Sequence, residues 1–206
     1  MPVIVVANPK GGVGKSTLAT NLAGALARAG HSVMLGDVDR QQSAHQWLAL
    51  RPTVLPVIRG WDVAHDAVVR PPKGTTHVVL DTPAGLHGRK LDDVMKIADR
   101  VIVPLQPSLF DIQASHTFVH ALLARKHSDR VGLGVVGMRV REGTIALDQL
   151  RHFLDALGVP VLAMLRDTQL YVQLAARGAT LWDIAPSRAE RDLAQWQPLL
   201  AWLDQP

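Results

Sequence analysis

Short apolar runs rich in Val and Ile alternate along the chain with stretches in which apolar residues recur every three to four positions. The short runs predict strands buried on both faces, and the longer stretches predict amphipathic helices. Strands are expected over Val3–Ala7, Ser32–Gly36, Val54–Ile58, Thr76–Leu80, Arg100–Pro104, Gly132–Met138 and Pro160–Leu165. Helices are expected over Ser16–Ala29, Gln41–Leu50, Trp61–Val69, Lys90–Ala98, Asp111–Lys126, Ile145–Leu157, Leu170–Arg177 and Arg188–Leu203. This alternation predicts an α/β fold in three layers: a doubly wound, mostly parallel sheet with helices on both faces.

Composition adds the expectation of a single domain over residues 1–206. The chain has 206 residues, 48% of them hydrophobic, and no Gly/Ser-rich or Pro-rich linker divides it. It contains no cysteine, which excludes disulfides, iron–sulfur clusters and zinc sites built on thiolates. The amino terminus lacks the pattern of a signal peptide, and no stretch reaches the roughly 18 apolar residues that span a bilayer. A cytoplasmic protein is therefore expected.

A glycine-rich segment, Asn8–Thr17, lies between the first predicted strand and the first predicted helix. Its glycines let backbone N–H groups approach phosphate oxygens, and the start of the following helix adds further unpaired N–H groups. Lys15 is expected to reach the β- and γ-phosphates of a nucleotide, and the Ser16 hydroxyl to ligate Mg²⁺. The segment therefore predicts a P-loop that binds a nucleotide with Mg²⁺.

Two residues distinguish this loop from the general pattern G-x-x-x-x-G-K-[ST]. Pro9 stands where that pattern has glycine, and Lys10 adds a second lysine. The run Lys10-Gly11-Gly12-Val13-Gly14-Lys15-Ser16-Thr17 resembles the deviant Walker A motif of the ParA/MinD family of ATPases. Residues 36–42, 78–85 and 98–108, continued by Asp111, resemble the next three signatures of that family, in the same order along the chain.

The resemblance implies an ATP hydrolase, slow and stimulated by a partner, with roles for particular residues. Lys10 would cross a dimer interface to the nucleotide of the other subunit, so that ATP drives homodimerisation. Asp81 would hold Mg²⁺ through a water, Asp39 would orient the attacking water near the metal, and Asp37 would support the site. The implied catalytic residues are Lys10, Lys15 and Asp39, and the implied metal residues are Ser16, Asp39 and Asp81. The implied nucleotide-binding residues are Lys10, Gly11, Gly12, Val13, Gly14, Lys15, Ser16, Thr17, Met138 and Arg139.

Two positions depart from the family's pattern. Arg40 stands where the family generally has proline, after the second Asp of its switch I segment. Met138 stands where the family often has the Asn of an Asn-Arg pair that follows a strand. Met138 and Arg139 are therefore the candidates for contact with the adenine base. A methionine at a strand end is equally typical of core packing, and that alternative stays open for Met138.

The family couples one nucleotide switch to several outputs, and the fold does not decide among them. The lack of cysteine excludes its iron–sulfur members. A membrane-binding helix of the MinD type is not expected at the carboxyl terminus, because no Lys or Arg follows Arg191 and because Pro198 would interrupt a long helix. A closing helix packed on the core is the expected role of that segment.

Among the activities that the nucleotide switch could control, we expect non-specific DNA binding of the ParA type. Lys and Arg number 22 against 18 Asp and Glu, a modest excess that by itself decides nothing. Arginines in the carboxyl-terminal half are the candidate phosphate contacts, namely Arg139, Arg141, Arg166, Arg177 and Arg188. No helix-turn-helix module is expected before the first strand, so sequence-specific autoregulation is not expected.

The sequence thus predicts a small ParA-type ATPase that forms an ATP-dependent sandwich dimer. It would be nucleoid-associated when ATP-bound and would segregate or position a plasmid, chromosome or protein cargo. Its partner would be an adaptor or a centromere-binding protein that stimulates hydrolysis. The alternatives are a MinD-like membrane-cycling regulator and a biosynthetic ligase of the dethiobiotin synthetase type.

Overall fold

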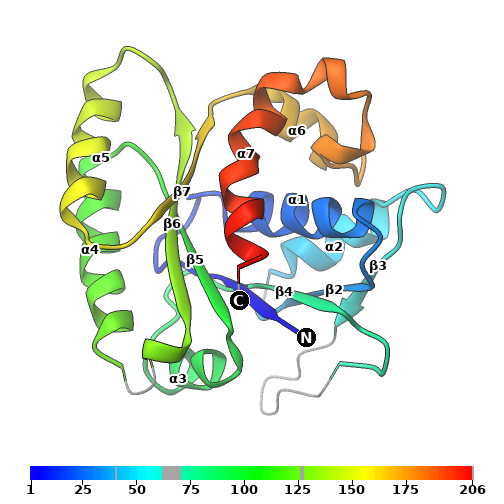
Figure 1. Ribbon diagram of the computed structural model, residues 1–206, viewed down its shortest axis with the longest axis horizontal. Coiled ribbons are helices and arrows are strands. Elements are labelled where there is room, and N and C mark those ends of the chain that lie inside the picture. Colours follow the sequence, from blue (N-terminus) through cyan, green and yellow to red (C-terminus); the bar gives the residue numbers. More distant parts are fainter. Residues whose placement is uncertain (40, 62–70, 126–127, 206) are drawn as a thin grey trace.

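A sheet of seven parallel strands runs through the chain (Figure 1). The structure is a computed structural model and describes residues 1–39, 41–61, 71–125 and 128–205. The strands are β1 (Val3–Val6), β2 (Val33–Asp37), β3 (Ile58–Trp61), β4 (His77–Asp81), β5 (Arg100–Leu105), β6 (Gly132–Val140) and β7 (Val161–Arg166). They lie in the order β3-β2-β4-β1-β5-β6-β7, and each pair of neighbours is parallel.

Helices cover both faces of the sheet. They are α1 (Lys15–Arg28), α2 (Ser43–Leu50), α3 (Gly88–Ile97), α4 (Leu109–Leu123), α5 (Ile145–Ala156), α6 (Gln169–Ala175) and α7 (Glu190–Leu203). Short 3₁₀ turns are η1 (Ser128–Arg130), η2 (Leu181–Asp183) and η3 (Pro186–Arg188). Buried side chains of α1, α2, α6 and α7 form one core cluster with the sheet, and those of α3, α4 and α5 form the other. Figure 1 shows these two groups of helices on opposite sides of the strands. The predicted doubly wound α/β fold is confirmed.

The central position of β1 places the glycine-rich loop. β1 pairs with β4 on one side and with β5 on the other, and Val5 and Val6 are fully buried. The chain reverses its direction of winding here, and loops that leave the carboxyl ends of the strands diverge around such a point to form a crevice. The loop after β1, the segments after β2 and β4 and the loop after β5 therefore meet at one edge of the sheet.

The third strand lies elsewhere than predicted. The expected strand Val54–Ile58 is a loop up to its last residue, and β3 covers Ile58–Trp61 instead. Val54 is 88% exposed and Val57 66% exposed, so this apolar run is not a core segment. Pro52 and Pro56 lie within or beside it, and prolines disfavour a paired strand. The helix predicted over Trp61–Val69 is wrong at Trp61, which belongs to β3, and its remaining residues lie outside the described part of the chain.

Pro198, which was expected to interrupt a long helix, does not interrupt the last one. Helix α7 continues through it to Leu203. Pro198 has no N–H to donate to the Ala194 carbonyl. Both residues lie on the solvent-exposed side of the helix, so water can donate a hydrogen bond to that carbonyl. On the opposite side Trp196 and Leu199 are fully buried in the core, which holds the helix against the sheet. The expected closing helix packed on the core is confirmed.

Candidate functional site

The loop after β1 has the conformation that a phosphate-binding turn needs. Gly12 and Gly14 have φ angles of 76° and 97°, which L-residues with a side chain rarely adopt. A Cβ on Gly14 would also lie 2.8 Å from Cε of Met138. Helix α1 begins at Lys15 with Gly14 as its N-cap, and no side chain caps it. The N–H groups of its first turn are therefore available to an anion.

Side chains from distant parts of the chain fix this loop. The buried Asn8 accepts a hydrogen bond from Lys10 N at 2.8 Å and donates to Pro104 O at 2.7 Å and to Ser115 Oγ at 3.0 Å. The amide of Gly85 donates to Pro9 O at 2.8 Å. The amino-terminal half of the loop is therefore anchored to β5, to α4 and to the segment after β4.

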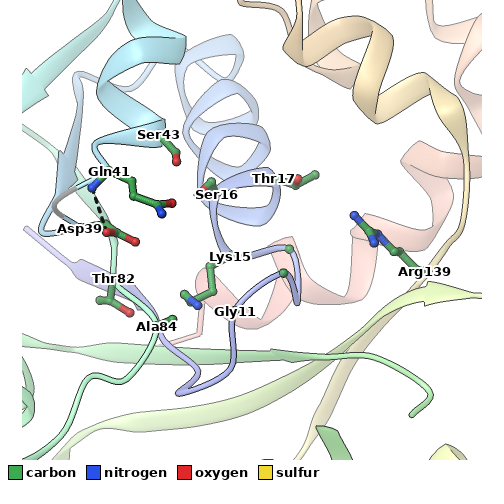
Figure 2. A pocket seen from close by; sticks show the side chains of 12 residues that line it. Gly11, Lys15, Ser16, Thr17, Asp39, Gln41, Ser43, Thr82, Ala84 and Arg139 are labelled. Carbon is green, nitrogen blue, oxygen red and sulfur yellow. Dashed lines mark hydrogen bonds between the residues drawn. The ribbon is translucent and has the colours of Figure 1, made fainter.

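A cavity of about 640 Å³ opens over the loop, within the size range of small-molecule sites (Figure 2). Figure 2 shows the P-loop and the start of α1 in its middle, the segments after β2 and β4 on one side, and Arg139 on the other. The lining residues are Gly11, Gly12, Gly14, Lys15, Ser16, Thr17, Asp39, Gln41, Ser43, Thr82, Ala84 and Arg139. Six of the predicted P-loop residues are thus brought together with Asp39 and Arg139.

Four lining residues were not singled out as site residues from the sequence: Gln41, Ser43, Thr82 and Ala84. They lie within or directly beyond the segments that carry the family resemblance, which is the signal that could have identified them. Thr82 also donates from Oγ1 to Val6 O at 2.8 Å, which ties the segment after β4 to the end of β1.

Lys15 has a cationic side chain in a largely buried position. Its Nζ donates to Lys10 O at 2.8 Å, within the same loop. Burial lowers the pKa of Lys15, and the carboxylates of Asp81 and Asp39 act in the opposite direction by favouring the charged form. The Lys15 ammonium, which lines the cavity, therefore lies near Asp39 and Asp81, the two carboxylates predicted to act at the metal.

Asp81 is the most perturbed carboxyl group of the site. Its side chain is 1% exposed, and among the described residues its Oδ1 has no hydrogen-bond partner. Burial raises its pKa to about 7, although the Ser16 hydroxyl donates a hydrogen bond to it and Lys15 lies nearby. A buried carboxylate oxygen without a partner beside a hydroxyl is a donor set that suits Mg²⁺.

The donor set at this point is small. Within the described ranges no group of three or more His, Asp or Glu residues could hold a metal ion. Mg²⁺ prefers one or two protein ligands together with phosphate oxygens and waters. Ser16 and Asp81 fit that preference, and Mg²⁺ would have to complete its shell from a bound nucleotide and from water.

The two aspartates of the segment after β2 have different surroundings. Asp37 is buried and accepts hydrogen bonds from Asp39 N at 2.9 Å and from Ala44 N at 2.8 Å, which caps helix α2. Asp39 lines the cavity, and its Oδ1 accepts a bond from Gln41 N at 3.0 Å. The geometry therefore suits the supporting role expected of Asp37 and leaves Asp39 beside the cavity. Arg40, whose departure from the family pattern was noted, lies outside the described residues.

Met138 lies in the core and does not line the cavity. It is 4% exposed, belongs to the core beneath Gly14 and is not among the residues that line the cavity. Val13 has a buried side chain too, so only its backbone can reach a ligand. These surroundings suit the alternative interpretation of Met138 as core packing, and its contact with adenine stays a prediction.

Arg139 faces the cavity because β6 has a bulge. Between Gly137 and Val140 the register to β7 slips by one residue, and Arg139 has a φ of 52°. A bulge re-aims the side chain of its extra residue. Arg139 is exposed between the buried Met138 and Val140, and Figure 2 shows its guanidinium pointing toward Thr17.

The five arginines predicted to contact DNA differ in how they are bonded. Arg166 makes two hydrogen bonds to the buried Asp192, at 2.7 and 2.9 Å. Arg141 bonds Asp167 on the surface. Arg139, Arg177 and Arg188 are exposed. The charge of Arg166 is already neutralised inside the protein, which makes a structural role its main one.

Comparison with known proteins agrees with this geometry. The family described as "CobQ/CobB/MinD/ParA nucleotide binding domain" matches residues 4–181. The chain is 33% identical over 211 aligned positions to "Maintenance of carboxysome distribution protein A" of Gloeobacter kilaueensis, covering 98% of this chain and 94% of that protein. It is 31% identical over 163 positions to "Chromosome-partitioning ATPase Soj" of Thermus thermophilus, covering 63% of each.

Solved structures share the fold at lower sequence identity. The MinD cell division protein of Aquifex aeolicus has a TM-score of 0.78 at 19% identity, covering 100% of this chain and 99% of that one. An ATP complex of McdA from Cyanothece has a TM-score of 0.74 at 16% identity, covering 97% and 96%. These structures support the three-layer architecture around the loop after β1.

Proposed function

The chain belongs to the CobQ/CobB/MinD/ParA family of nucleotide-binding domains, and on that premise we propose that it is an ATP-hydrolysing positioning protein. It binds ATP with Mg²⁺, dimerises in that state, binds DNA without sequence preference and is reset by slow, partner-stimulated hydrolysis. The observation that carries this proposal is the P-loop with its second lysine, Lys10, beside a cavity that holds Lys15, Ser16 and Asp39.

The residues around the cavity suit hydrolysis of a γ-phosphate. Lys15 and the amides of the P-loop neutralise phosphate charge, and they are fixed before ATP arrives, as electrostatic catalysis requires. Asp39 lies on the same side of the cavity as Gln41, where it can orient a water for attack. Ser16 and Asp81 would hold Mg²⁺, which supplies further neutralisation of the charge that develops on the phosphate oxygens.

Dimerisation is assigned to Lys10 because its position separates it from the chemistry of its own subunit. The described residues that line the cavity include Lys15 but not Lys10. A cation that reaches the nucleotide of a second subunit makes the dimer depend on the triphosphate and stabilises transition-state charge as well. Hydrolysis then loosens the dimer.

DNA binding is assigned to arginines on the exposed surface. Arg177 and Arg188 bound the segment between α6 and α7, drawn in orange in Figure 1, and both are exposed. Arginine binds phosphate without reading bases, so the expected affinity is independent of sequence and falls steeply with salt. Arg139 lines the cavity and Arg141 is paired with Asp167, so both are expected to contribute less. Arg166 is expected to contribute least because Asp192 neutralises it.

The relatives support a positioning role in cells. A protein named for the maintenance of carboxysome distribution matches almost the whole chain, and a chromosome-partitioning ATPase matches 63% of it. We therefore expect a plasmid, chromosome or protein assembly as cargo, recognised through an adaptor that stimulates hydrolysis. The expected location remains the cytoplasm, with nucleoid association in the ATP-bound state.

No helix in the described residues is long and apolar enough to cross a membrane. A membrane-cycling role of the MinD type receives less support for a separate reason, which concerns α7. The apolar side of α7 packs on the core through Trp196 and Leu199, so that side is not available to lipid. A biosynthetic ligase of the dethiobiotin synthetase type has no specific observation in its favour here.

Light scattering with ATP or ADP tests dimerisation, and gel shifts with DNA duplexes of unrelated sequence test non-specific DNA binding. We expect ATP-dependent dimers and ATP-dependent shifts for the wild type, and neither for Lys10→Ala, although that variant still binds ATP. Lys90→Ala, which removes an exposed lysine from α3, is the matched control. Unimpaired dimerisation of Lys10→Ala would refute the role of Lys10. No DNA shift, with ATP-dependent cosedimentation on liposomes, would favour the membrane alternative.

A further inference from the structure

The side chain of Gln106 contacts the P-loop from a different part of the chain. Gln106 directly follows β5, which pairs in parallel with β1, so the loops after these two strands leave the sheet side by side. Its Nε2 donates a hydrogen bond of 2.8 Å to the carbonyl oxygen of Gly12. Gln106 lies within residues 98–108, which resemble a family signature, but the catalytic roles assigned above do not use it.

This bond fixes the orientation of one peptide group in the loop. In a planar trans peptide the C=O and the following N–H point in opposite directions. Since the Gly12 carbonyl points toward Gln106, the Val13 N–H points away from Gln106. Gly11, Gly12 and Gly14 line the cavity, and Gln106 is not among the described residues that do so. The direction away from Gln106 is therefore toward the inner side of the loop.

We propose that Gln106 is a positioning residue for the phosphate chain of the nucleotide: it holds the Gly12 carbonyl on the outside of the loop and thereby aims the Val13 N–H at a phosphate oxygen. The Val13 amide donates to no other backbone group among the described residues, so it is available to the ligand. The inference rests on the proposed function, because it requires that a nucleoside triphosphate binds this loop.

The loop needs such a support at Gly12. The contacts of Asn8 and Gly85 fix the segment before it, at Lys10 N and Pro9 O. Glycine turns about its backbone bonds at low cost, and Gly12 already has a positive φ of 76°. A rotated Gly12–Val13 peptide would present the negative end of the carbonyl dipole to phosphate in place of an N–H donor.

Gln106 is itself held in place for this contact. Pro107 follows it, and the residue before a proline is restricted to extended backbone. The amide of Ser108 donates to the Gln106 carbonyl at 2.8 Å, which closes a tight turn. Little backbone freedom is therefore lost when the side chain bonds Gly12, which is the property expected of a preorganised support.

Two substitutions separate this role from simple packing. Gln106→Ala removes the donor, and Gln106→Glu keeps the shape but places an acceptor against the Gly12 carbonyl. We expect Gln106→Ala to weaken ATP and ADP binding about fivefold, the effect of one hydrogen bond, and Gln106→Glu to weaken it more. KM for ATP should rise while kcat changes less than about twofold, because the lost contact acts on bound substrate and transition state alike.

The test is isothermal titration of the purified protein with ATP·Mg²⁺ and ADP·Mg²⁺, together with steady-state hydrolysis and thermal unfolding without nucleotide. Gln113→Ala and Gln113→Glu make the same changes at an exposed position on α4 and serve as controls. Wild-type affinity in Gln106→Ala, or in Gln106→Glu, would overturn the inference, as would a loss explained by lower thermal stability. Failure of the wild type to bind ATP would instead overturn the proposed function.

Discussion

Replacement of Asp81 by asparagine should stabilise the protein when nucleotide and metal are absent. Asp81 is 1% exposed, its Oδ1 has no hydrogen-bond partner among the described residues, and burial raises its pKa to about 7. A carboxylate with a raised pKa resists ionisation in the folded state and ionises freely in the unfolded state. The asparagine amide has nearly the same shape and no charge.

The direction and size of the effect follow from the two pKa values. Between pH 4 and pH 7 the folded protein retains a proton on Asp81 that the unfolded chain, at an ordinary 3.8, releases. The folded state therefore loses stability as pH rises through this window, and the loss levels off above pH 7. At about 1.4 kcal/mol for each pKa unit, Asp81→Asn should gain about 1–2 kcal/mol at pH 5 and about 4 kcal/mol at pH 8.

Urea unfolding in EDTA, followed by circular dichroism from pH 5 to pH 8, measures this difference. Asp155→Asn removes the same charge from the exposed side of α5 and should show no such trend. In the presence of ATP and Mg²⁺ the wild type should be more stable than Asp81→Asn, because only the wild type keeps the carboxylate for the metal. A stability difference between Asp81→Asn and the wild type that is the same at pH 5 and pH 8 would refute the argument.

Two further substitutions remove buried carboxylates that accept hydrogen bonds, one beside the cavity and one elsewhere in the fold. Asp37→Ala leaves Asp39 N and Ala44 N without their acceptor; the free energy of unfolding in urea should fall by about 1–2 kcal/mol, as for a lost helix cap, and hydrolysis should fall with it. Asp183→Ala leaves Arg51 without its carboxylate in a pair whose side chains are 1% and 5% exposed; a loss of about 3–5 kcal/mol is expected, and a thermal unfolding temperature equal to that of the wild type would contradict it.

The central strands could be predicted because their apolar runs are buried on both faces. Residues 78–80 and 101–103 are fully buried, as their sequence indicated. The same reasoning failed at Val54 and Val57, which are apolar but exposed. Hydrophobicity alone does not tell whether a neighbouring strand is present, and the flanking prolines were the better signal. β3 has only its first and last residues buried, so it gave no run to detect.

The phosphate site could be predicted because its determinants are local. Glycines that adopt positive φ and a lysine at the start of the first helix act within ten residues, so their spacing specifies the loop. The supports of the loop act across the chain instead. Asn8 bonds Ser115, and Gln106 bonds Gly12, at separations of 107 and 94 residues. These contacts depend on β5 lying beside β1, which the alternation of elements does not specify.

Which residue near the end of β6 lines the cavity could not be predicted from the periodicity, because it depends on a shift of one residue in the strand register. An extra residue between Gly137 and Val140 exchanges which side chains face the core, so Met138 turns inward and Arg139 outward. A slip of one residue reverses the faces of a strand, and sequence patterns do not locate such bulges. The resemblance implied that both residues contact adenine, and of the two only Arg139 lines the cavity.

Lys10→Ala tests the dimer while it keeps two hydrogen bonds that the backbone of Lys10 makes in the loop. Its N–H donates to Asn8 Oδ1 and its carbonyl accepts from Lys15 Nζ, each at 2.8 Å. Alanine keeps both of these backbone atoms, so the bonds to Asn8 and from Lys15 should be kept. ATP affinity within one subunit should therefore stay close to that of the wild type. If Lys10→Ala abolishes ATP binding itself, the ammonium acts within its own subunit, and the assignment of Lys10 to a partner's nucleotide is wrong.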